Sequence, residues 1–129
     1  MTLLITGGSG TLGRSLGARF PEALRPTRRE LDITDERSVE AYLSAHPPSA
    51  VIHAAALTDV SRCEAEPDLA WRVNVEGTEI LLKAARGVAP DCYFLYVSTA
   101  GVFRGDTGNY SEESRTDPVN QYGVTKLEG

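Results

Sequence analysis

The sequence has few cysteines and no long run of apolar residues. Its two cysteines, Cys63 and Cys92, form no C-x-x-C pair, so neither a zinc site nor a disulfide framework is indicated. Met1 is followed almost at once by a predicted strand, without a charged leader or an apolar segment long enough to span a bilayer. We therefore expect a cytoplasmic protein with reduced thiols and no membrane segment.

Clusters of basic residues are also absent. The 13 Lys and Arg residues are outnumbered by 18 Asp and Glu residues, and the longest basic cluster is Arg28-Arg29. A net charge of −5 without a basic patch excludes nucleic acid and an anionic membrane surface as main partners. His46 and His53 have no metal-ligand spacing, so we predict no metal site.

What the sequence does contain is the composition of one globular domain that can bury a core. It has 129 residues, of which 41% are hydrophobic and 24% charged. Strand-like apolar runs alternate with segments of helical periodicity. The predicted strands are 3–6, 22–28, 50–56 and 92–98. One predicted helix follows the glycines at 7–13, two others run from 35 to 45 and from 67 to 87, and the last begins near 120. The segment 101–117 is predicted as a loop.

This alternation predicts right-handed βαβ units and an α/β fold, namely a Rossmann-type doubly wound, mostly parallel sheet flanked by helices. We expect 50–56 and 92–98 to be buried on both faces, whereas Pro26 places 22–28 near a sheet edge. Ligands of such sheets bind beyond the carboxyl ends of the strands, where the strand order reverses. The turns after Thr6, Ala54 and Val97 should therefore meet in one crevice.

The first predicted strand leads directly into a glycine-rich turn. Two interpretations overlap there: Gly8, Gly10 and Gly13 form a G-x-G-x-x-G motif, and Gly7, Gly10 and Gly13 form a T-G-x-x-G-x-x-G motif. In both, the missing Cβ atoms let the backbone approach a pyrophosphate, and the N–H groups of the following helix point at its charge. A strand-to-helix turn that binds nothing is the alternative for such a motif on its own.

The end of the second predicted strand bears on the choice of dinucleotide. An NAD site needs an acidic side chain there for the ribose 2′-hydroxyl, and Glu30 and Asp32 come slightly too late. Arg28, with Arg29 beside it, could pair with a 2′-phosphate through its fork of donors. The sequence therefore favours NADP(H) over NAD(H), with two solvated surface arginines as the alternative.

Two further signals fall at the ends of later elements. Tyr122 and Lys126 stand at i and i+4 on one face of the last predicted helix, where the ammonium would favour the phenolate and let Tyr122 exchange a proton near pH 7. Ser98 and Thr99 end a predicted strand, where a hydroxyl can hydrogen-bond a reacting carbonyl. Each signal alone is typical of a surface pair or a turn, but together they occur in the order that one crevice requires.

Taken as a set, the motifs resemble the extended short-chain dehydrogenase/reductases. A narrower group is similar to the dTDP-4-dehydrorhamnose reductase, or RmlD-like, branch, and the resemblance covers essentially the whole chain. The motifs that carry it are Thr6-Gly-Gly-Ser-Gly-Thr-Leu-Gly13, Leu31-Asp-Ile-Thr-Asp35, His53-Ala-Ala-Ala-Leu-Thr-Asp-Val60, Cys63-Glu-Ala-Glu-Pro67, Asn74-Val-Glu-Gly-Thr78, Ser98-Thr99-x-x-Val102-Phe103 and Tyr122-x-x-x-Lys126.

The resemblance implies a cofactor site and a catalytic group. The residues expected at the cofactor are Gly7, Gly10, Thr11, Leu12 and Gly13 at the pyrophosphate, Asp32 and Ile33 at the adenine, Ala54, Ala55 and Ala56 beneath the adenosine and ribose, and Arg28, Val97, Ser98, Tyr122 and Lys126. The expected catalytic residues are the hydroxyl of Thr99, the proton donor Tyr122, the ribose-binding cation Lys126 and the helix asparagine Asn74.

Two features depart from the pattern of this branch. Ala100-Gly101 stands where the branch usually has Asp-Tyr and where nucleotide-sugar dehydratases have Asp-Glu, which argues against dehydration. The sequence also ends within the helix of Tyr122 and Lys126. We therefore expect residues 1–129 to be an incomplete NAD(P)-binding Rossmann domain without the C-terminal substrate domain.

Two hypotheses of function follow. The first is an NAD(P)-dependent reductase that transfers hydride to a keto-sugar, in particular a 4-keto nucleotide sugar. The second is a non-catalytic NADP-binding module like the regulatory subunit of methionine adenosyltransferase, which resembles the same branch. The expected partner is a small-molecule keto-sugar, and a homodimer stays open.

Overall fold

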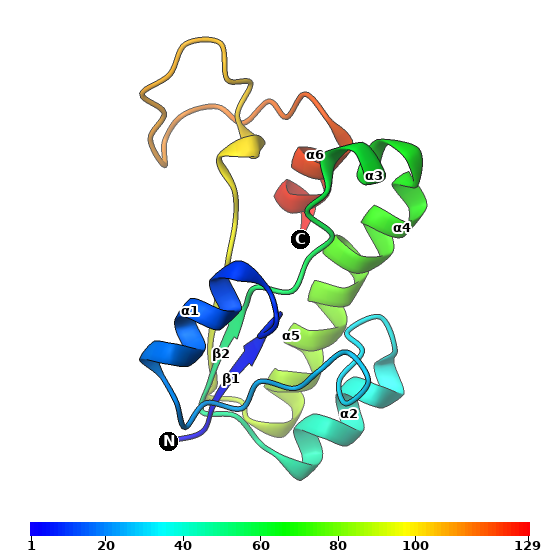
Figure 1. Cartoon of the computed structure of the whole chain (residues 1–129), viewed down its shortest axis with the longest axis vertical. Helices are drawn as coiled ribbons and strands as arrows, with labels where there is room; N and C mark the ends of the chain where they lie inside the picture. Colours follow the sequence, from blue (N-terminus) through cyan, green and yellow to red (C-terminus); the bar gives the residue numbers. More distant parts are fainter.

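The computed structural model describes residues 1–129 as a three-stranded parallel sheet with helices on both of its faces (Figure 1). In chain order the elements are β1 (Leu3–Thr6), α1 (Thr11–Arg19), α2 (Glu36–Ala45), β2 (Ala50–His53), α3 (Val60–Ala65), α4 (Pro67–Trp71), the π-helical turn η1 (Arg72–Glu76), α5 (Gly77–Val88), β3 (Tyr93–Tyr96), the 3₁₀ turn η2 (Ala100–Val102) and α6 (Gln121–Glu128). The α/β fold predicted from the alternation of elements is confirmed.

The strand order is β1-β2-β3, and the predicted strand at 22–28 is wrong. Only Leu24 pairs with β1: its N–H donates to the Leu3 carbonyl at 2.8 Å, and its carbonyl accepts from Ile5 N–H at 2.9 Å. The next donor in a parallel ladder would come from Pro26, which has no N–H, so the pairing stops. Leu24 nevertheless lies beside β1, on the edge away from β2. After β1 the chain thus runs first to one side of this strand and then to the other, which is a reversal of strand order at β1.

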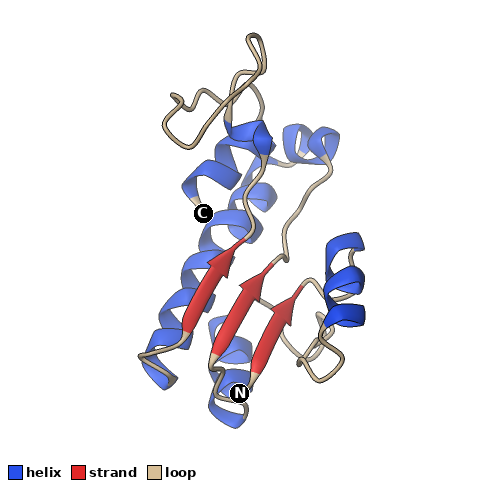
Figure 2. Cartoon of the chain, turned by 90° about the vertical axis from the view of Figure 1, so that its left-hand side faces the viewer, coloured by secondary structure: helices blue, strands red, loops and turns tan.

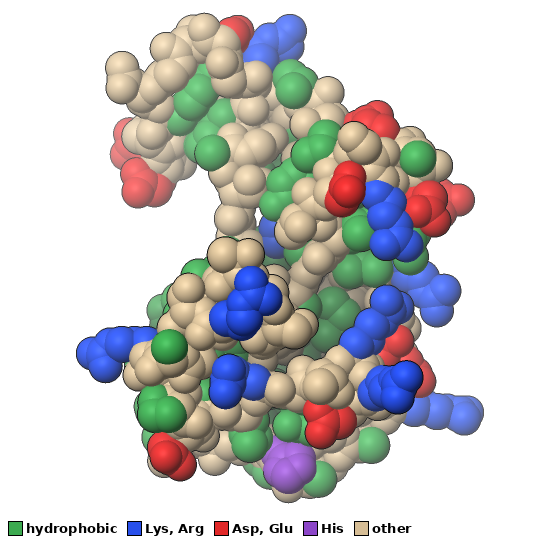
Figure 3. Space-filling model, viewed as in Figure 1, with side chains coloured by type: hydrophobic (Ala, Val, Ile, Leu, Met, Phe, Trp, Pro, Cys, Tyr) green, Lys and Arg blue, Asp and Glu red, His purple; other side chains and the backbone are tan.

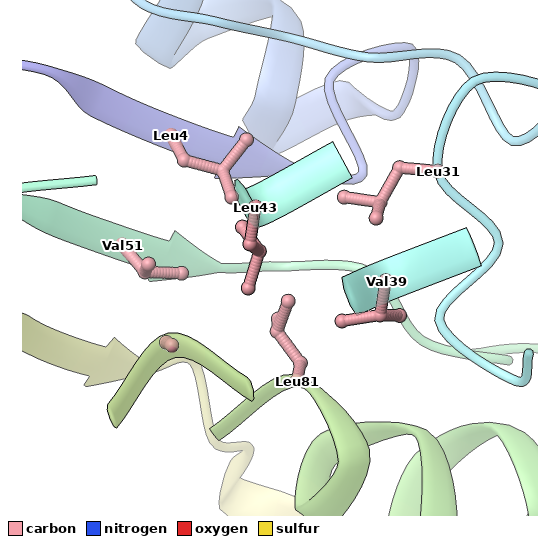
Figure 4. Packing of buried hydrophobic residues seen from close by; sticks show 7 residues of the cluster. Leu4, Leu31, Val39, Leu43, Val51 and Leu81 are labelled. Carbon is pink, nitrogen blue, oxygen red and sulfur yellow. The ribbon is translucent and has the colours of Figure 1, made fainter. Parts of the chain in front are cut away.

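One face of the sheet carries the main hydrophobic core (Figure 4). Leu4 of β1 and Val51 of β2 are fully buried there, against residues of α2 and α5. Asp35 begins α2 as its N-cap, because its carboxylate accepts a hydrogen bond from Arg37 N–H at 3.0 Å. The buried cluster consists of Leu4, Leu31, Val39, Leu43, Val51, Leu81 and Ala85.

The opposite face is covered over β1 but open over β3. Helix α1 packs against β1, with its buried Gly13 facing the turn at Gly7 and Gly8 and its buried Gly17 facing the Arg25 side chain, and Figure 2 shows no helix in front of β3 on this side. Tyr93 is 68% exposed and Leu95 is 40% exposed. The expectation that 92–98 is buried on both faces is therefore wrong, because no element of residues 1–129 packs on this side of β3.

Helices α4, η1 and α5 follow one another without a break from Pro67, which stands at the first helical position. The π-helical turn between them contains the buried Asn74, and such turns often occur at functional sites. The last helix, α6, begins as expected after Asn120, whose side chain accepts from Gly123 N–H at 2.8 Å. None of the helices combines the length and apolar character needed to cross a membrane.

Candidate functional site

A cleft of about 580 Å³ opens at the carboxyl ends of β1 and β2, where the strand order reverses. Figure 3 shows this face hollowed between the part that holds α1 and the part that holds α3 and α4, with Lys and Arg side chains on both sides. The predicted cofactor residues that line the cleft are Gly7, Gly10, Thr11, Leu12, Gly13, Arg28, Asp32, Ile33, Ala54, Ala55 and Ala56.

Backbone geometry at the floor of the cleft requires glycine at two positions. Gly7 has a φ of +71°, and a Cβ there would lie 2.8 Å from the amide nitrogen of Ala55. A Cβ on Gly13 would overlap the carbonyl oxygen of Gly7. The motif that begins with Gly7 therefore describes the turn better than the overlapping G-x-G-x-x-G motif.

The N-terminus of α1 leaves backbone donors free at the cleft. Its N-cap, Gly10, has no side chain to accept a hydrogen bond, and the first N–H groups of any helix lack an intrahelical partner. Thr11, Leu12 and Gly13 carry these groups and line the cleft. The free donors and the positive end of the helix dipole fit a pyrophosphate.

Arg28 and Asp32 stand together at the mouth of the cleft. The Nε atom of Arg28, whose side chain is 78% exposed, lies 3.7 Å from a carboxylate oxygen of Asp32. Partial burial opposes ionisation of Asp32, but hydrogen bonds from Thr34 and the charge of Arg28 hold the pKa of this carboxyl below its usual value. The expectation that Asp32 comes too late to reach the site is therefore wrong, because 22–28 is not a strand and Asp32 lines the cleft together with Arg28.

A chain of buried hydrogen bonds joins the ends of β1 and β2 to the following helices. The Thr78 hydroxyl donates to the Asn74 carbonyl at 2.7 Å, so it accepts from Nε2–H of His53 at 3.0 Å. The Nδ1 atom of His53 then accepts from the Thr6 hydroxyl at 2.6 Å, and Thr6 in turn accepts from Ala55 N–H at 3.2 Å. These bonds assign one neutral tautomer to His53.

The Asn74 side chain connects this chain of bonds to α6. Its Oδ1 accepts from Leu57 N–H at 2.8 Å, and its Nδ2 donates to the Leu57 carbonyl at 3.0 Å and to the Thr125 hydroxyl at 2.9 Å. The Thr125 hydroxyl donates to the Tyr122 carbonyl at 3.0 Å. Asn74 is 1% exposed, so its spacing alone would have placed it wrongly on a solvated helix face.

Thr99 and Tyr122 lie on either side of Gly101. The Cβ position that Gly101 lacks is 3.5 Å from Thr99 Oγ1 and 3.9 Å from Tyr122 Cδ1, so the two side chains border the same small space. The Thr99 hydroxyl also accepts from Gly101 N–H at 3.1 Å. These groups and Lys126, together with Val97 and Ser98, do not line the cleft itself.

Burial changes the proton affinity of two titratable side chains near α6. It lowers the pKa of Lys126, which is 4% exposed, to about 8. Burial, assisted by the charge of Lys126, lowers the pKa of His53 to about 4. No role for His53 beyond its motif can be predicted from the sequence, because its two threonine partners, Thr6 and Thr78, come from distant segments.

Some cleft residues had no sequence signal of their own. Thr58 lies within a motif of the family resemblance, and Arg62 lies between two of these motifs. Leu69 and Val73 repeat at helical spacing that equally fits a core position. The Arg62 guanidinium is bound to the Glu66 carboxylate at 2.8 Å.

A parallel sheet with a glycine turn and a cleft at its switch point is the Rossmann-type architecture of the extended short-chain dehydrogenase/reductase class. Within that class, the chain belongs to the RmlD substrate binding domain family, whose sequence model matches residues 1–129.

Individual relatives are similar over nearly the whole chain. A dTDP-4-dehydrorhamnose reductase of Streptomyces griseus is 40% identical over 98% of this chain and 42% of its own length. Methionine adenosyltransferase 2 subunit beta of Xenopus laevis is 37% identical over 98% of this chain and 40% of its own length. The dTDP-4-dehydrorhamnose reductase of Bacillus anthracis, solved in complex with NADP, superposes with a TM-score of 0.90 at 32% identity, covering 99% of this chain and 48% of its own. The chain thus spans less than half the length of these relatives.

Proposed function

We propose that residues 1–129 form the cofactor-binding part of an NADP(H)-dependent reductase that acts on a keto-sugar, in particular a 4-keto nucleotide sugar. The observation that carries the proposal is the cleft, whose glycine floor and free helix donors fit a dinucleotide pyrophosphate. The S. griseus relative, a dTDP-4-dehydrorhamnose reductase, supports the substrate class. The B. anthracis relative, solved with NADP, supports the cofactor.

In this proposal, the bound nicotinamide supplies the hydride, and the side chains around Gly101 act on the substrate oxygen. The Thr99 hydroxyl donates a hydrogen bond to the carbonyl oxygen, which holds it in place. Tyr122 gives its hydroxyl proton to the same oxygen as the carbonyl becomes an alcohol. The Lys126 ammonium stabilises the phenolate left behind and binds the cofactor ribose.

Asn74 acts on this group without touching the substrate. Its three hydrogen bonds tie α6 to the backbone of Leu57 and to the hydroxyl of Thr125. Because Thr125 directly precedes Lys126 and binds the Tyr122 carbonyl, the asparagine fixes the helix turn that carries the proton donor and the cation.

The test uses the longest chain that the gene encodes. The expected result is NADPH binding together with NADPH-dependent reduction of a 4-keto nucleotide sugar. Tyr122→Phe should lower kcat by at least about a hundredfold while NADPH binding stays intact. Undiminished reduction by Tyr122→Phe would contradict the assigned proton donor.

A second candidate function is a regulatory module that binds NADP without turnover. The similarity to methionine adenosyltransferase 2 subunit beta of X. laevis favours it, as does Ala100-Gly101 in place of the usual Asp-Tyr. Co-purification with a partner enzyme, together with NADPH binding and no reduction of any keto-sugar, would select this function over the first.

A further inference from the structure

Lys126 is a buried cation without an acidic partner. It is 4% exposed, and none of the ion pairs of the chain includes it. A buried ammonium costs free energy unless another group compensates for the lost water. Some other part of the structure must therefore keep this side chain charged and in place.

The group that faces the ammonium is the aromatic ring of Tyr96, the last residue of β3. The Nζ atom of Lys126 lies 4.0 Å from the ring centroid, well inside the range of a cation–π contact. The Tyr96 hydroxyl donates to the carbonyl oxygen of Lys126 at 3.3 Å. One side chain thus contacts both the charged end and the backbone of the lysine.

The surroundings fix the Tyr96 ring in turn. The ring of His53 lies against it with centroids 5.8 Å apart, and α6 with Lys126 lies on it as well. Burial raises the pKa of Tyr96 to about 12, and the charge of Tyr122 adds to this rise, so Tyr96 stays neutral. The charge of Lys126 acts on His53, and its ammonium lies on the Tyr96 ring. The carboxylate that contacts α6 is that of Glu64, which accepts from Gln121 N–H at the first residue of the helix and forms no ion pair with Lys126.

We propose that Tyr96 is a positioning residue for Lys126, whose ring face holds the ammonium at the carboxyl end of β3 and whose hydroxyl holds the backbone of α6. The consequence for ribose binding and proton transfer rests on the proposed reductase function. The contact itself can be tested without cofactor. The ring favours the charged amine, whereas burial favours the neutral one, so removing the ring should make Lys126 lose its proton at a lower pH.

The titration can be followed by NMR on the longest chain that the gene encodes, labelled with ¹³C-lysine. Within residues 1–129 the lysines are Lys83 and Lys126, and their side-chain signals are assigned by their loss in Lys83→Arg and Lys126→Arg. Tyr96→Leu should lower the midpoint of Lys126 by about one pH unit and remove the ring-current shift of its ε-protons. Tyr96→Phe keeps the ring and should preserve both.

Two controls are built into the chain. The side chain of Lys83 is 78% exposed, and its signal should not respond to any change at position 96. Tyr93→Leu removes a tyrosine from the exposed face of the same strand and should leave the Lys126 midpoint unchanged. An unchanged Lys126 midpoint in folded Tyr96→Leu would overturn the proposal, as would equal midpoints in Tyr96→Leu and Tyr96→Phe.

If Tyr96→Leu does not fold, the ring can be altered without changing its shape. Pentafluorophenylalanine in place of Tyr96 withdraws the negative charge from the ring face, so the Lys126 midpoint should fall relative to Tyr96→Phe. No fall would overturn the proposal.

The same variants separate the proposal from the function on which it rests. In the reductase, Tyr96→Leu should raise the KM for NADPH several-fold and move the alkaline limb of the kcat profile down by the same pH shift, and Tyr96→Phe should restore both. A wild-type chain that fails to bind NADPH would contradict the proposed function but leave the lysine titration as a valid test of the contact.

Discussion

The two halves of the candidate site are built in different ways. The phosphate half is made by backbone atoms of one continuous segment, residues 7–13, in which two missing Cβ atoms define the shape. The catalytic half is held by side chains from distant segments. These side chains are Thr6 of β1, His53 of β2, Asn74 of η1, Thr78 of α5 and Thr125 of α6.

This difference determines how each half responds to change. The turn has no room for a Cβ at Gly7 or Gly13, so one methyl group at either position is enough to disrupt it. In a network of side chains the stabilisation is shared among several hydrogen bonds. Removing one side chain therefore costs less stability than disrupting the turn does, and its effect extends to the neighbouring bonds. The following predictions test whether the two halves fail independently.

The largest effect should come from Gly13→Ala. Its new Cβ would overlap the Gly7 carbonyl oxygen, so the turn must open. We expect destabilisation of about 4 kcal/mol and at least about a hundredfold weaker NADPH binding. The measurements are denaturant unfolding and fluorescence titration with NADPH.

A matched control exists within α5. A Cβ on Gly87 would meet no atom within 4 Å, so Gly87→Ala should leave cofactor binding unchanged and stabilise the chain by up to about 1 kcal/mol. Equal losses of binding in Gly87→Ala and Gly13→Ala would show that the turn geometry is not what the cofactor requires.

The next effect should come from Asn74→Ala, which breaks the link to α6. The change removes three hydrogen bonds and leaves the half-buried N–H of Leu57 without its partner. We expect destabilisation of about 3 kcal/mol. Hydrogen exchange should show that amides of α6 lose protection before those of β1. Thr125→Val removes one of these bonds and should cost about 1 kcal/mol.

The contrast between the halves also explains what the sequence could predict. The strand, glycine turn and helix at the start of the chain are predicted correctly because their signal is local, whereas the binding of a dinucleotide there stays a prediction. A role for Asn74 is expected only from the family resemblance. The contacts of His53 and Tyr96 had no sequence signal, since their partners lie on segments that only the folded chain brings together.

The errors in the predicted fold have a similar origin. Segment 22–28 was predicted as a short strand near a sheet edge, but the missing N–H of Pro26 ends its pairing after Leu24. The apolar run 92–98 suits a strand covered on both faces, yet Tyr93 and Leu95 stay exposed because coverage depends on which helices reach that side of the sheet. Local patterns predict the elements, but not what packs on them.

A smaller effect should appear when acid protonates His53. Because burial and the charge of Lys126 lower its pKa to about 4 from 6.5, the unfolded chain binds more protons between these values. The free energy of unfolding should therefore fall as the pH falls through this window, by about 2 kcal/mol between pH 7 and 4.5.

This acid sensitivity is tested by urea unfolding across the pH range. His53→Gln, which has no titrating ring, should flatten the dependence, although it lowers stability at pH 7 through lost packing and hydrogen bonds. His46, the other histidine, is exposed, and His46→Gln should keep the wild-type slope. A slope unchanged in His53→Gln would remove His53 as its source.

The smallest effect should come from Arg28→Ala, which bears on the choice of cofactor within the phosphate half. The Nε atom of Arg28 lies 3.7 Å from the Asp32 carboxylate, which is a loose ion pair. The other guanidinium donors of Arg28 remain available at the mouth of the cleft to bind a 2′-phosphate. Arg28→Ala should weaken NADPH binding about tenfold and leave NADH binding unchanged. Arg29→Ala is the matched control, because Arg29 is also exposed but does not line the cleft.

If the ratio of NADPH to NADH affinity is the same in Arg28→Ala as in the wild type, Arg28 does not select the phosphate. Asp32 would then be the residue to change, because its carboxylate is the other charged group at the same edge and would favour the 2′-hydroxyl of NADH.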